Sequence, residues 1–218
     1  MISARQSIDR TAQPERARGR AGVGTPVGGE RGAIGYVAVG ANLGDRLTTL
    51  RTAVDALDAH PGIEVDRDRG VSSLYETTPV GAPDRQPNYL NAVVRLTTTL
   101  SPLDLLEALQ AIETRLGRVR GRANAARSID LDVVLLGGLV LNDDRLIVPH
   151  PRMHERRFVL EPLREIAPRE QHPVLSLTID ELAAGARTAH AGDRIARVAG
   201  PEWRRDGTRI AAHVEHRR

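Results

Sequence analysis

The sequence predicts an α+β fold, a ferredoxin-like α/β sandwich with helices on one face of a central, mostly antiparallel sheet. Two observations predict it. Segments with strand-like and helix-like patterns follow one another in the order β-α-β-β-α-β, the order of the split βαβ arrangement. Of the 218 residues, 40% are hydrophobic, enough for one domain with its own core.

The first three elements lie between residues 33 and 80. Ala33–Gly40 is a continuous apolar run, which predicts a buried strand. Gly44–His60 has the period of an amphipathic helix, with an apolar face made of Leu47, Leu50, Val54 and Leu57. Val71–Val80 predicts a second strand that leads into a Gly/Pro-rich loop.

The glycines at the start of that first helix invite comparison with nucleotide-binding loops. The segment Val39-Gly-Ala-Asn-Leu-Gly-Asp45 lacks the Lys-Ser/Thr of a P-loop and the third glycine of a dinucleotide fingerprint. We therefore interpret it as the N-terminal turn of the helix.

The remaining elements follow the loop. Tyr89–Leu100 predicts a strand, and Ser101-Pro102 supplies an N-cap and a first-turn proline for the next helix. The stripe of that helix consists of Leu103, Leu106, Leu109, Ile112 and Leu116. Ser128–Gly137 predicts the last strand of the sandwich and residues 139–148 a hairpin. Thr178 and Glu181 have the spacing of a capping box.

Both ends of the chain differ from this domain in composition. Residues 1–32 are rich in Arg, Gly, Ala and Pro and have no apolar period, so we expect a disordered basic extension. We expect the folded domain over residues 33–200 and a basic tail over residues 201–218.

The composition excludes several kinds of chemistry. Cysteine is absent, which excludes disulfides, thiolate catalysis and Cys-based zinc sites. All 31 basic residues counted as Lys+Arg are arginine, so Schiff-base catalysis and a P-loop lysine are excluded and phosphate must be bound by guanidinium groups.

Charge and hydropathy set the expected partners and location. A net charge of +3 and only 2% aromatic residues do not favour a nucleic-acid partner. No apolar run approaches the roughly 20 residues of a membrane span, and no signal peptide is evident. We expect a soluble cytoplasmic monomer that acts on small molecules, with no membrane partner.

Two aspartates inside the last strand are the first candidate functional residues. Residues i and i+2 of a strand point to one face, so Asp130 and Asp132 project together while Ile129, Leu131 and Val133 face the core. Such a pair suits two divalent cations that hold a polyphosphate. On spacing alone, an exposed strand edge that carries acids explains the pattern equally well.

The arginines before the strand favour the cation site. Arg118, Arg120, Arg122 and Arg127 lie on a Gly/Ala-rich loop with no regular period. A solvated basic loop is the usual interpretation, but beside a metal-binding acid pair it is typical of phosphoryl transfer, where charge neutralisation does most of the catalysis.

These residues also carry a resemblance to a known family. The segment Arg127-Ser-Ile-Asp130-Leu-Asp132 resembles the R-x-x-D-[LIV]-D signature of 6-hydroxymethyl-7,8-dihydropterin pyrophosphokinase, a folate-biosynthesis enzyme. The similarity runs from about Ile34 to Pro168 and includes GANLGDR, SSLYETTPVG, YLNAVV, IETRLGRVR and VPHPRMHERRFVLEPL. The resemblance implies a ferredoxin-like fold and transfer of pyrophosphate from ATP to a reduced pterin, with two Mg²⁺ ions and release of AMP.

The resemblance also implies roles for individual residues. Asp130 and Asp132 would bind magnesium, and Arg118 and Arg127 would contact the phosphates. The ATP site would comprise Gln110, Glu113, Arg120, Val133, Arg145, Ile147, His150 and Arg156. The pterin pocket would comprise Thr77, Thr78, Pro79, Val80, Tyr89, Asn91 and Phe158, with the pterin between the rings of Tyr89 and Phe158. Taken singly, either ring is more often a core residue and His150 more often a structural one.

The chain departs from the family pattern at three places. Ala123-Asn-Ala-Ala126 replaces a stretch that usually holds a basic residue, Trp, Gly and Pro, and the loop is one residue shorter. Thr78 and Pro151 replace a proline and an aromatic residue. Because the missing Trp helps to seal the site in the family, we expect an active enzyme with impaired loop closure.

Other functions use some of the same residues. A two-metal phosphohydrolase or nuclease would also pair aspartates with arginines, but needs further acidic or histidine ligands. A degenerate paralogue would keep the fold without the activity. A ferredoxin-like RNA-binding module is a third alternative, which the lack of sheet aromatics disfavours.

Overall fold

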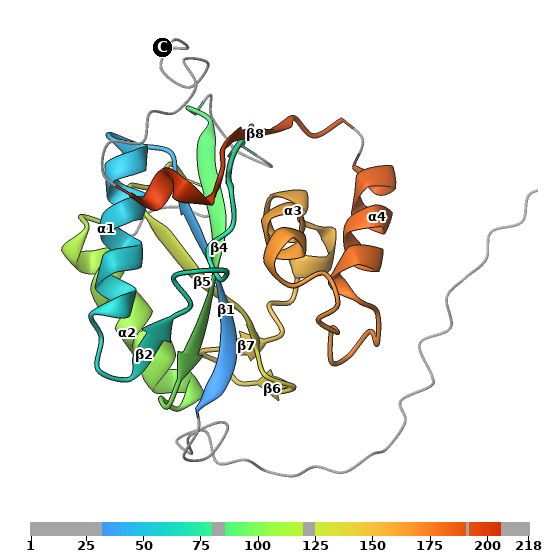
Figure 1. Ribbon diagram of the computed structural model, residues 1–218, viewed down its shortest axis with the longest axis horizontal. Coiled ribbons are helices and arrows are strands. Elements are labelled where there is room, and N and C mark those ends of the chain that lie inside the picture. The colour runs from blue at the N-terminus through green and yellow to red at the C-terminus, as the bar shows by residue number, and fades with distance from the viewer. Residues whose placement is uncertain (1–31, 80–85, 120–124, 191, 206–218) are drawn as a thin grey trace, which may run out of the picture.

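The structure, a computed structural model, describes residues 32–79, 86–119, 125–190 and 192–205. A central sheet lies between two pairs of helices (Figure 1). The strands are β1 (Ala33–Ala41), β2 (Ile63–Val65), β3 (Leu74–Thr77), β4 (Tyr89–Thr98), β5 (Asp130–Leu136) and β8 (Ile195–Ala199), and β6 (Leu141–Asn142) and β7 (Ile147–Val148) form a hairpin. The helices are α1 (Arg46–Asp58), α2 (Pro102–Arg115), α3 (Arg157–Ile166) and α4 (Ile179–Ala189), with 3₁₀ turns η2 (Met153–Glu155) and η3 (Pro201–Arg204).

The sheet has the order β5-β1-β4-β3-β8, and β2 pairs with the same edge of β4 as β3 does. Every pairing among the described strands of this sheet is antiparallel, which confirms the expected sheet. The register places Gly40 of β1 between Asp130 of β5 and Asn91 of β4. Residues from three strands therefore meet on one line across the sheet.

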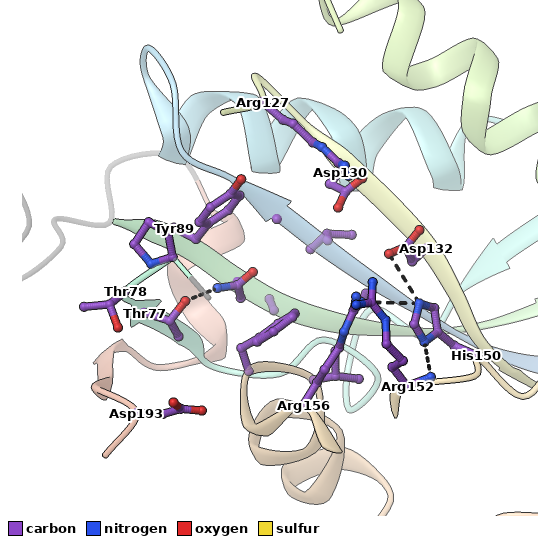
Figure 2. Close-up of a pocket in the computed structure, with 18 of the residues that line it drawn as sticks. Thr77, Thr78, Tyr89, Arg127, Asp130, Asp132, His150, Arg152, Arg156 and Asp193 are labelled. Carbon is purple, nitrogen blue, oxygen red and sulfur yellow. Dashed lines mark hydrogen bonds and ion pairs between the residues drawn. The ribbon is translucent and has the colours of Figure 1, made fainter. Parts of the chain in front are cut away.

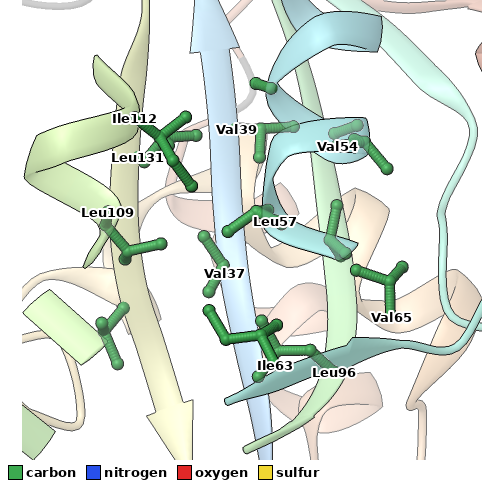
Figure 3. Close-up of a cluster of buried hydrophobic side chains, with 14 of the residues drawn as sticks. Val37, Val39, Val54, Leu57, Ile63, Val65, Leu96, Leu109, Ile112 and Leu131 are labelled. Carbon is green, nitrogen blue, oxygen red and sulfur yellow. The ribbon is translucent and has the colours of Figure 1, made fainter. Parts of the chain in front are cut away.

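Helices α1 and α2 cover one face of the sheet, as expected. Leu57 of α1 and Leu109 and Ile112 of α2 pack among side chains of β1, β4 and β5 (Figure 3). Ser101 caps α2 as expected, because its side chain accepts a hydrogen bond from the Asp104 N–H. The side chain of Asp45 caps α1 in the same way, accepting from the Thr48 N–H. The loop before α1 is thus a helix cap, as interpreted from the sequence.

The face of α2 is rotated from the expected stripe. Leu105 and Ala108 are buried, whereas Leu103, Leu106 and Leu116 are only partly buried. Residues 105, 108, 109 and 112 follow the i, i+3, i+4, i+7 rule, and the three other leucines lie on its flanks.

Helices α3 and α4 cover part of the opposite face (Figure 1), so the expectation of helices on one face holds only for α1 and α2. Val159, Leu160 and Leu163 of α3 pack with Tyr36 and Val93 of the sheet. Pro162 lies inside α3; a proline disfavours helix in a sequence pattern, and the apolar residues around it overcome that preference by burial.

The chain after α4 returns to the sheet. Strand β8 pairs with β3 and forms an edge, and Trp203 in η3 is fully buried against the α1 side of the sheet. Residues 201–205, expected to be tail, are therefore packed on the domain. The predictions for residues 1–31 and 206–218 lie outside the described residues. No helix in the described part of the chain has the length and apolar character to cross a bilayer.

Candidate active site

A cavity of about 480 Å³ opens on the sheet face that α3 partly covers. Its floor comes from β1, β3, β4 and β5, and its sides come from the segment after β7, the start of α3 and the turn before β8. Figure 2 shows Asp130, Asp132, His150 and Arg156 toward one end, and Thr77, Thr78 and Asp193 toward the other.

Asp130 and Asp132 of β5 both line this cavity. The residues between and beside them, Ile129, Leu131 and Val133, are at most 4% exposed and pack on the α1/α2 side. The alternation predicted from the sequence is therefore confirmed. Small residues lie opposite the carboxylates on β1, because Gly40 pairs with Asp130 and Ala38 with Asp132, and they leave room above the sheet.

Arginines bind the first carboxylate directly. Asp130 Oδ1 lies 2.7 Å from Arg127 Nη1 and 2.8 Å from Arg118 Nη1. Arg118 also pairs with Glu113 of α2. Charge-assisted contacts of this kind fix both partners, so two arginines are held where the strand begins.

Glu113 supports this cluster from behind the strand. It is buried, and its Oε1 accepts a hydrogen bond of 2.7 Å from the backbone N–H of Leu131. Burial raises the pKa of the Glu113 carboxyl above its ordinary value, while the Leu131 N–H and Arg118 lower it. The structure therefore places Glu113 as an anchor for Arg118 and β5, outside the cavity lining.

Asp132 has a different environment from Asp130. Among the described residues the nearest basic side chain is His150, with 4.0 Å between Nε2 and Oδ2. Although 43% of the side chain is reachable by solvent, it lies within the cavity, and burial, followed by the charge of Asp130, raises its pKa. A bound divalent cation would offset both effects.

The two carboxylates fit a hard divalent cation. Oxygen ligands suit Mg²⁺, which usually keeps several waters and binds one or two carboxylates together with substrate phosphates. The described residues contain no cluster of three or more His, Cys, Asp or Glu side chains able to hold a metal. A cation at Asp130 and Asp132 would therefore take its other ligands from phosphate and water.

His150 is held as a neutral donor. Its Nδ1 accepts a hydrogen bond from the backbone N–H of Arg152 (3.1 Å), so Nε2 carries the proton in the neutral ring and faces Asp132. Arg156 Nη1 also lies 3.3 Å from Nε2; because a neutral imidazole accepts at only one nitrogen, we assign the acceptor to Nδ1, which has the shorter contact. Burial, then the charges of Arg156 and Arg152, lowers the pKa of His150 to about 4.

Arg127 owes its position to Asn42, in the loop after β1. The Arg127 N–H donates to Asn42 Oδ1 (2.7 Å), and the Asn42 N–H donates to the Arg127 carbonyl (3.1 Å). The Asn42 amide also donates to Gln86 and to the Pro87 carbonyl. One buried asparagine thereby joins the segment before β5 to the segment before β4, and both segments contribute lining residues.

Two aromatic side chains also line the cavity. Tyr89 of β4 and Phe158 of α3 both line it, and the Arg156 guanidinium lies 5.4 Å from the Phe158 ring centroid. Asn91, which is buried, donates from Nδ2 to Thr77 Oγ1 at 2.8 Å. That bond fixes the amide orientation and leaves the buried Oδ1 facing Gly40.

Sequence comparison identifies the family. Residues 36–168 match the sequence model of 7,8-dihydro-6-hydroxymethylpterin-pyrophosphokinase (HPPK), which is more than half of the chain. The chain belongs to the HPPK family. The cavity and its aspartate pair lie almost wholly within the matched residues.

Curated relatives agree with this assignment. The chain is 45% identical over 148 residues to the 2-amino-4-hydroxy-6-hydroxymethyldihydropteridine pyrophosphokinase of Bacillus subtilis, covering 68% of this chain and 86% of that protein. It is 45% identical over 133 residues to the Pseudomonas aeruginosa protein of the same name, covering 61% and 80%. It matches the Pneumocystis carinii folic acid synthesis protein fol1 at 42% identity, covering 66% of this chain and 19% of that longer one.

Solved HPPK-DHPS structures share the fold. A Plasmodium falciparum HPPK-DHPS crystallised with pterin and p-hydroxybenzoate gives a TM-score of 0.59 at 16% identity, covering 77% of this chain and 45% of that one. An HPPK-DHPS in complex with substrates gives 0.56 at 14% identity, covering 74% and 44%. The chain thus spans less than half of these structures, and the likeness supports the expected ferredoxin-like fold class.

Most of the residues that the HPPK resemblance assigned line the cavity: Thr77, Thr78, Pro79, Tyr89, Asn91, Arg127, Asp130, Asp132, His150, Arg156 and Phe158. Others do not. Arg118 and Glu113 stand behind Asp130, the Val133 side chain packs in the core, and Arg145 pairs with Glu107 on the surface. Gln110 of α2 and Ile147 of β7 also lie outside the lining. Val80 and Arg120 fall outside the described residues.

Several lining residues were missed by the sequence analysis: Ala38, Gly40, Gln86, Arg152, Glu155, His190 and Asp193. Ala38 and Gly40 were assigned only to a buried strand. The pairing of β1 with β5 places them beside the two carboxylates. His190 and Asp193 follow the matched segment, and no local motif marks them.

Replacing Gly40 with alanine is expected to raise the KM for the pterin several-fold with little change in the KM for ATP. The new Cβ would lie 2.8 Å from Asn91 Oδ1, so the amide must turn away from its bond to Thr77. Because the obstructing atom ends a side chain, folding should be largely preserved. Steady-state kinetics and a thermal melt test this, and an unchanged pterin KM would contradict the role given to Asn91.

Proposed function

We propose that this chain transfers the pyrophosphoryl group of ATP to the hydroxymethyl oxygen of 6-hydroxymethyl-7,8-dihydropterin, releasing AMP, as a step of folate biosynthesis. One observation carries the proposal: a single cavity is lined by a carboxylate pair, by arginines and by two aromatic side chains. Family membership and relatives above 40% identity support the same reaction. They give no support to a phosphohydrolase, a degenerate paralogue or an RNA-binding module.

ATP is the co-substrate of this family, and we propose that two Mg²⁺ ions accompany it at Asp130 and Asp132. When bound, such ions neutralise phosphate charge and lower the pKa of a coordinated alcohol. The protein keeps Asp130 between Arg118 and Arg127 and leaves the Asp132 carboxylate without an arginine partner among the described residues. Asp132 is therefore the more accessible ligand.

The cationic side chains orient the phosphate chain. Arg127 and Arg156 face the cavity beside the carboxylates, and Arg152 lies next to them. His150 presents an Nε2–H that can donate to a phosphate oxygen while remaining neutral at physiological pH, since its pKa is about 4. These donors stabilise the charge that develops on the leaving AMP.

The part of the cavity lined by Tyr89, Asn91 and Phe158 binds the acceptor. A flat bicyclic ring fits between aromatic side chains, and Asn91 supplies a fixed amide beside them. With the heterocycle held there, its hydroxymethyl group points toward Asp130 and Asp132, the arrangement that in-line transfer requires. A cation held by Asp130 and Asp132 would lower the pKa of the alcohol, and the lining residues would orient the alcohol toward the phosphate chain.

The direct test is product analysis. Purified protein with ATP, Mg²⁺ and the hydroxymethyl pterin should form AMP and the pterin diphosphate in equal amounts, separated by chromatography. AMP formation no higher than in the absence of pterin would refute the proposal. Formation of ADP or inorganic phosphate in place of AMP would indicate a different transfer.

Replacing Phe158 with alanine is expected to weaken pterin binding by about tenfold to hundredfold, because ring stacking contributes about 1–3 kcal/mol per base. Phe158→Tyr keeps the ring and serves as the matched control. Fluorescence titration of the pterin with a non-hydrolysable ATP analogue measures the Kd. If Phe158→Ala binds like the unaltered protein, the ring is a core residue and the stacking role is wrong.

The oligomeric state, the location and any partners other than the substrates are predicted from the sequence alone. We propose a monomer in the cytoplasm without nucleic-acid or membrane partners. Residues 123 and 124 of the altered segment lie outside the described residues, and we still expect an active enzyme that is slower or binds ATP more weakly.

A further inference from the structure

The turn between α4 and β8 forms a wall of the cavity that lies beyond the family match. The match ends at residue 168, whereas His190 and Asp193 line the cavity. Strand β8 pairs with β3 along its length, and the Thr78 N–H donates to the Arg194 carbonyl at 3.3 Å. This pairing sets Asp193 beside Thr77 and Thr78, at the end of the cavity away from Asp130 (Figure 2).

An arginine network fixes this turn on α3. Arg157 donates to the backbone carbonyls of His190 (3.0 Å) and Asp193 (3.3 Å). Arg157 also approaches Glu161, which pairs with Arg187 of α4. Because both contacts to the turn use backbone oxygens, the Asp193 side chain remains available to the cavity.

The Asp193 carboxylate has no hydrogen-bond or ion-pair partner among the described residues. Its own backbone groups are engaged, since the N–H donates to the His190 carbonyl at 3.1 Å and the carbonyl accepts from Arg157. A carboxylate that lines a cavity without a protein partner can accept hydrogen bonds from a bound ligand. A ligand with N–H donors along one edge would make those bonds.

The proposed acceptor has such an edge. A 2-amino-4-hydroxy pteridine in its 4-oxo form carries the 2-amino group and the ring N3–H side by side, and the 6-hydroxymethyl group lies on the other ring, at the far end of the molecule. When the hydroxymethyl group faces Asp130 and Asp132, the donor edge faces Thr77, Thr78 and Asp193. Two adjacent N–H donors match the two oxygens of one carboxylate.

Resting on the function proposed above, we propose that Asp193 is a specificity-determining residue that accepts hydrogen bonds from the 2-amino and N3–H edge of the pterin. It supplies a carboxylate beside Thr77 and Thr78, whereas Asp130 and Asp132 lie toward the other end of the cavity. Arg157 is its positioning residue, acting through the backbone of the turn.

The test compares Asp193→Ala and Asp193→Asn with Asp144→Ala, which removes an exposed aspartate in the turn between β6 and β7. Hydrogen bonds to charged groups predict an increase of about tenfold to hundredfold in the pterin Kd and KM for Asp193→Ala. Asp193→Asn should give a smaller increase, since it keeps one acceptor. The KM for ATP, the melting temperature and the Asp144→Ala kinetics should stay unchanged.

A pterin analogue without the 2-amino group tests the contact itself. The unaltered protein should lose affinity for the analogue, and Asp193→Ala should lose much less, as a coupled pair requires. Equal losses in both proteins, or an unchanged pterin Kd in Asp193→Ala, would overturn the inference while the transfer reaction stands. An unaltered protein that binds pterin but forms no AMP would refute the proposed function, and the Kd comparison would still decide the role of Asp193.

Discussion

Asp132→Ala is expected to lower kcat/KM by at least about 1,000-fold and to leave pterin binding intact. Metal charge stabilisation contributes several kcal/mol to a transition state, and 1,000-fold corresponds to about 4 kcal/mol. Asp132 is the candidate ligand without an arginine partner among the described residues, so no ion pair needs to break when it is replaced. Single-turnover AMP formation measures the loss, and fluorescence titration measures pterin affinity.

Asp132→Asn provides the matched control for shape. It keeps the volume of the side chain but removes the negative charge, so Mg²⁺-dependent binding of a non-hydrolysable ATP analogue should weaken in both variants. Melting temperatures should not fall, because removing a carboxylate whose pKa is raised by burial and by Asp130 relieves a repulsion. Turnover retained in either variant would show that the aspartates have a structural role.

The raised pKa of Asp132 also sets a pH dependence for the free protein. Protonation removes the charge that a cation needs, and a raised pKa moves that loss to a higher pH than for an ordinary carboxylate. The affinity of the unaltered protein for Mg²⁺ should therefore fall as the pH is lowered. The fall should begin at a higher pH than the ordinary pKa of aspartate predicts.

The sequence predicted the parts of the fold that depend on local pattern. The alternation around Asp130 and Asp132 placed both carboxylates on one face because strand periodicity is fixed by backbone geometry. The cap at Ser101 and the hairpin after β5 followed from local sequence in the same way. In each case the interaction that decides the structure spans only a few residues.

Features that depend on distant packing were not predicted. Helix α3 contains Pro162, and its burial against Tyr36 and Val93 comes from residues far away in the chain. The short strand β2 and the edge strand β8 exist because β4 and β3 offer open edges. No window of sequence contains that information, and Asp193 was missed for the same reason.

Trp203→Ala is expected to lower the free energy of unfolding by about 3–5 kcal/mol, the cost of emptying a large aromatic site in a core. Trp203 is the chain's one tryptophan and is fully buried. Its indole Nε1–H donates to the Ser72 carbonyl at 2.9 Å, and its own carbonyl accepts from Arg51 Nε at 2.6 Å. The residue thus joins the segment after β8 to α1 and to the chain before β3.

Trp203→Phe separates packing from hydrogen bonding. It keeps most of the ring volume and leaves the Ser72 carbonyl unpaired, so a smaller loss of about 1–3 kcal/mol is expected. Urea unfolding followed by circular dichroism measures the free energy of unfolding of both variants. Circular dichroism is used because neither variant has a tryptophan whose fluorescence could be followed. Because domains of this size are stable by only about 5–15 kcal/mol, the alanine variant should melt well below the unaltered protein. A decrease of less than about 1 kcal/mol in the free energy of unfolding would mean that residues 201–205 do not hold β8 on the domain. The turn that carries Asp193 would then lack the support that its proposed role in pterin recognition needs.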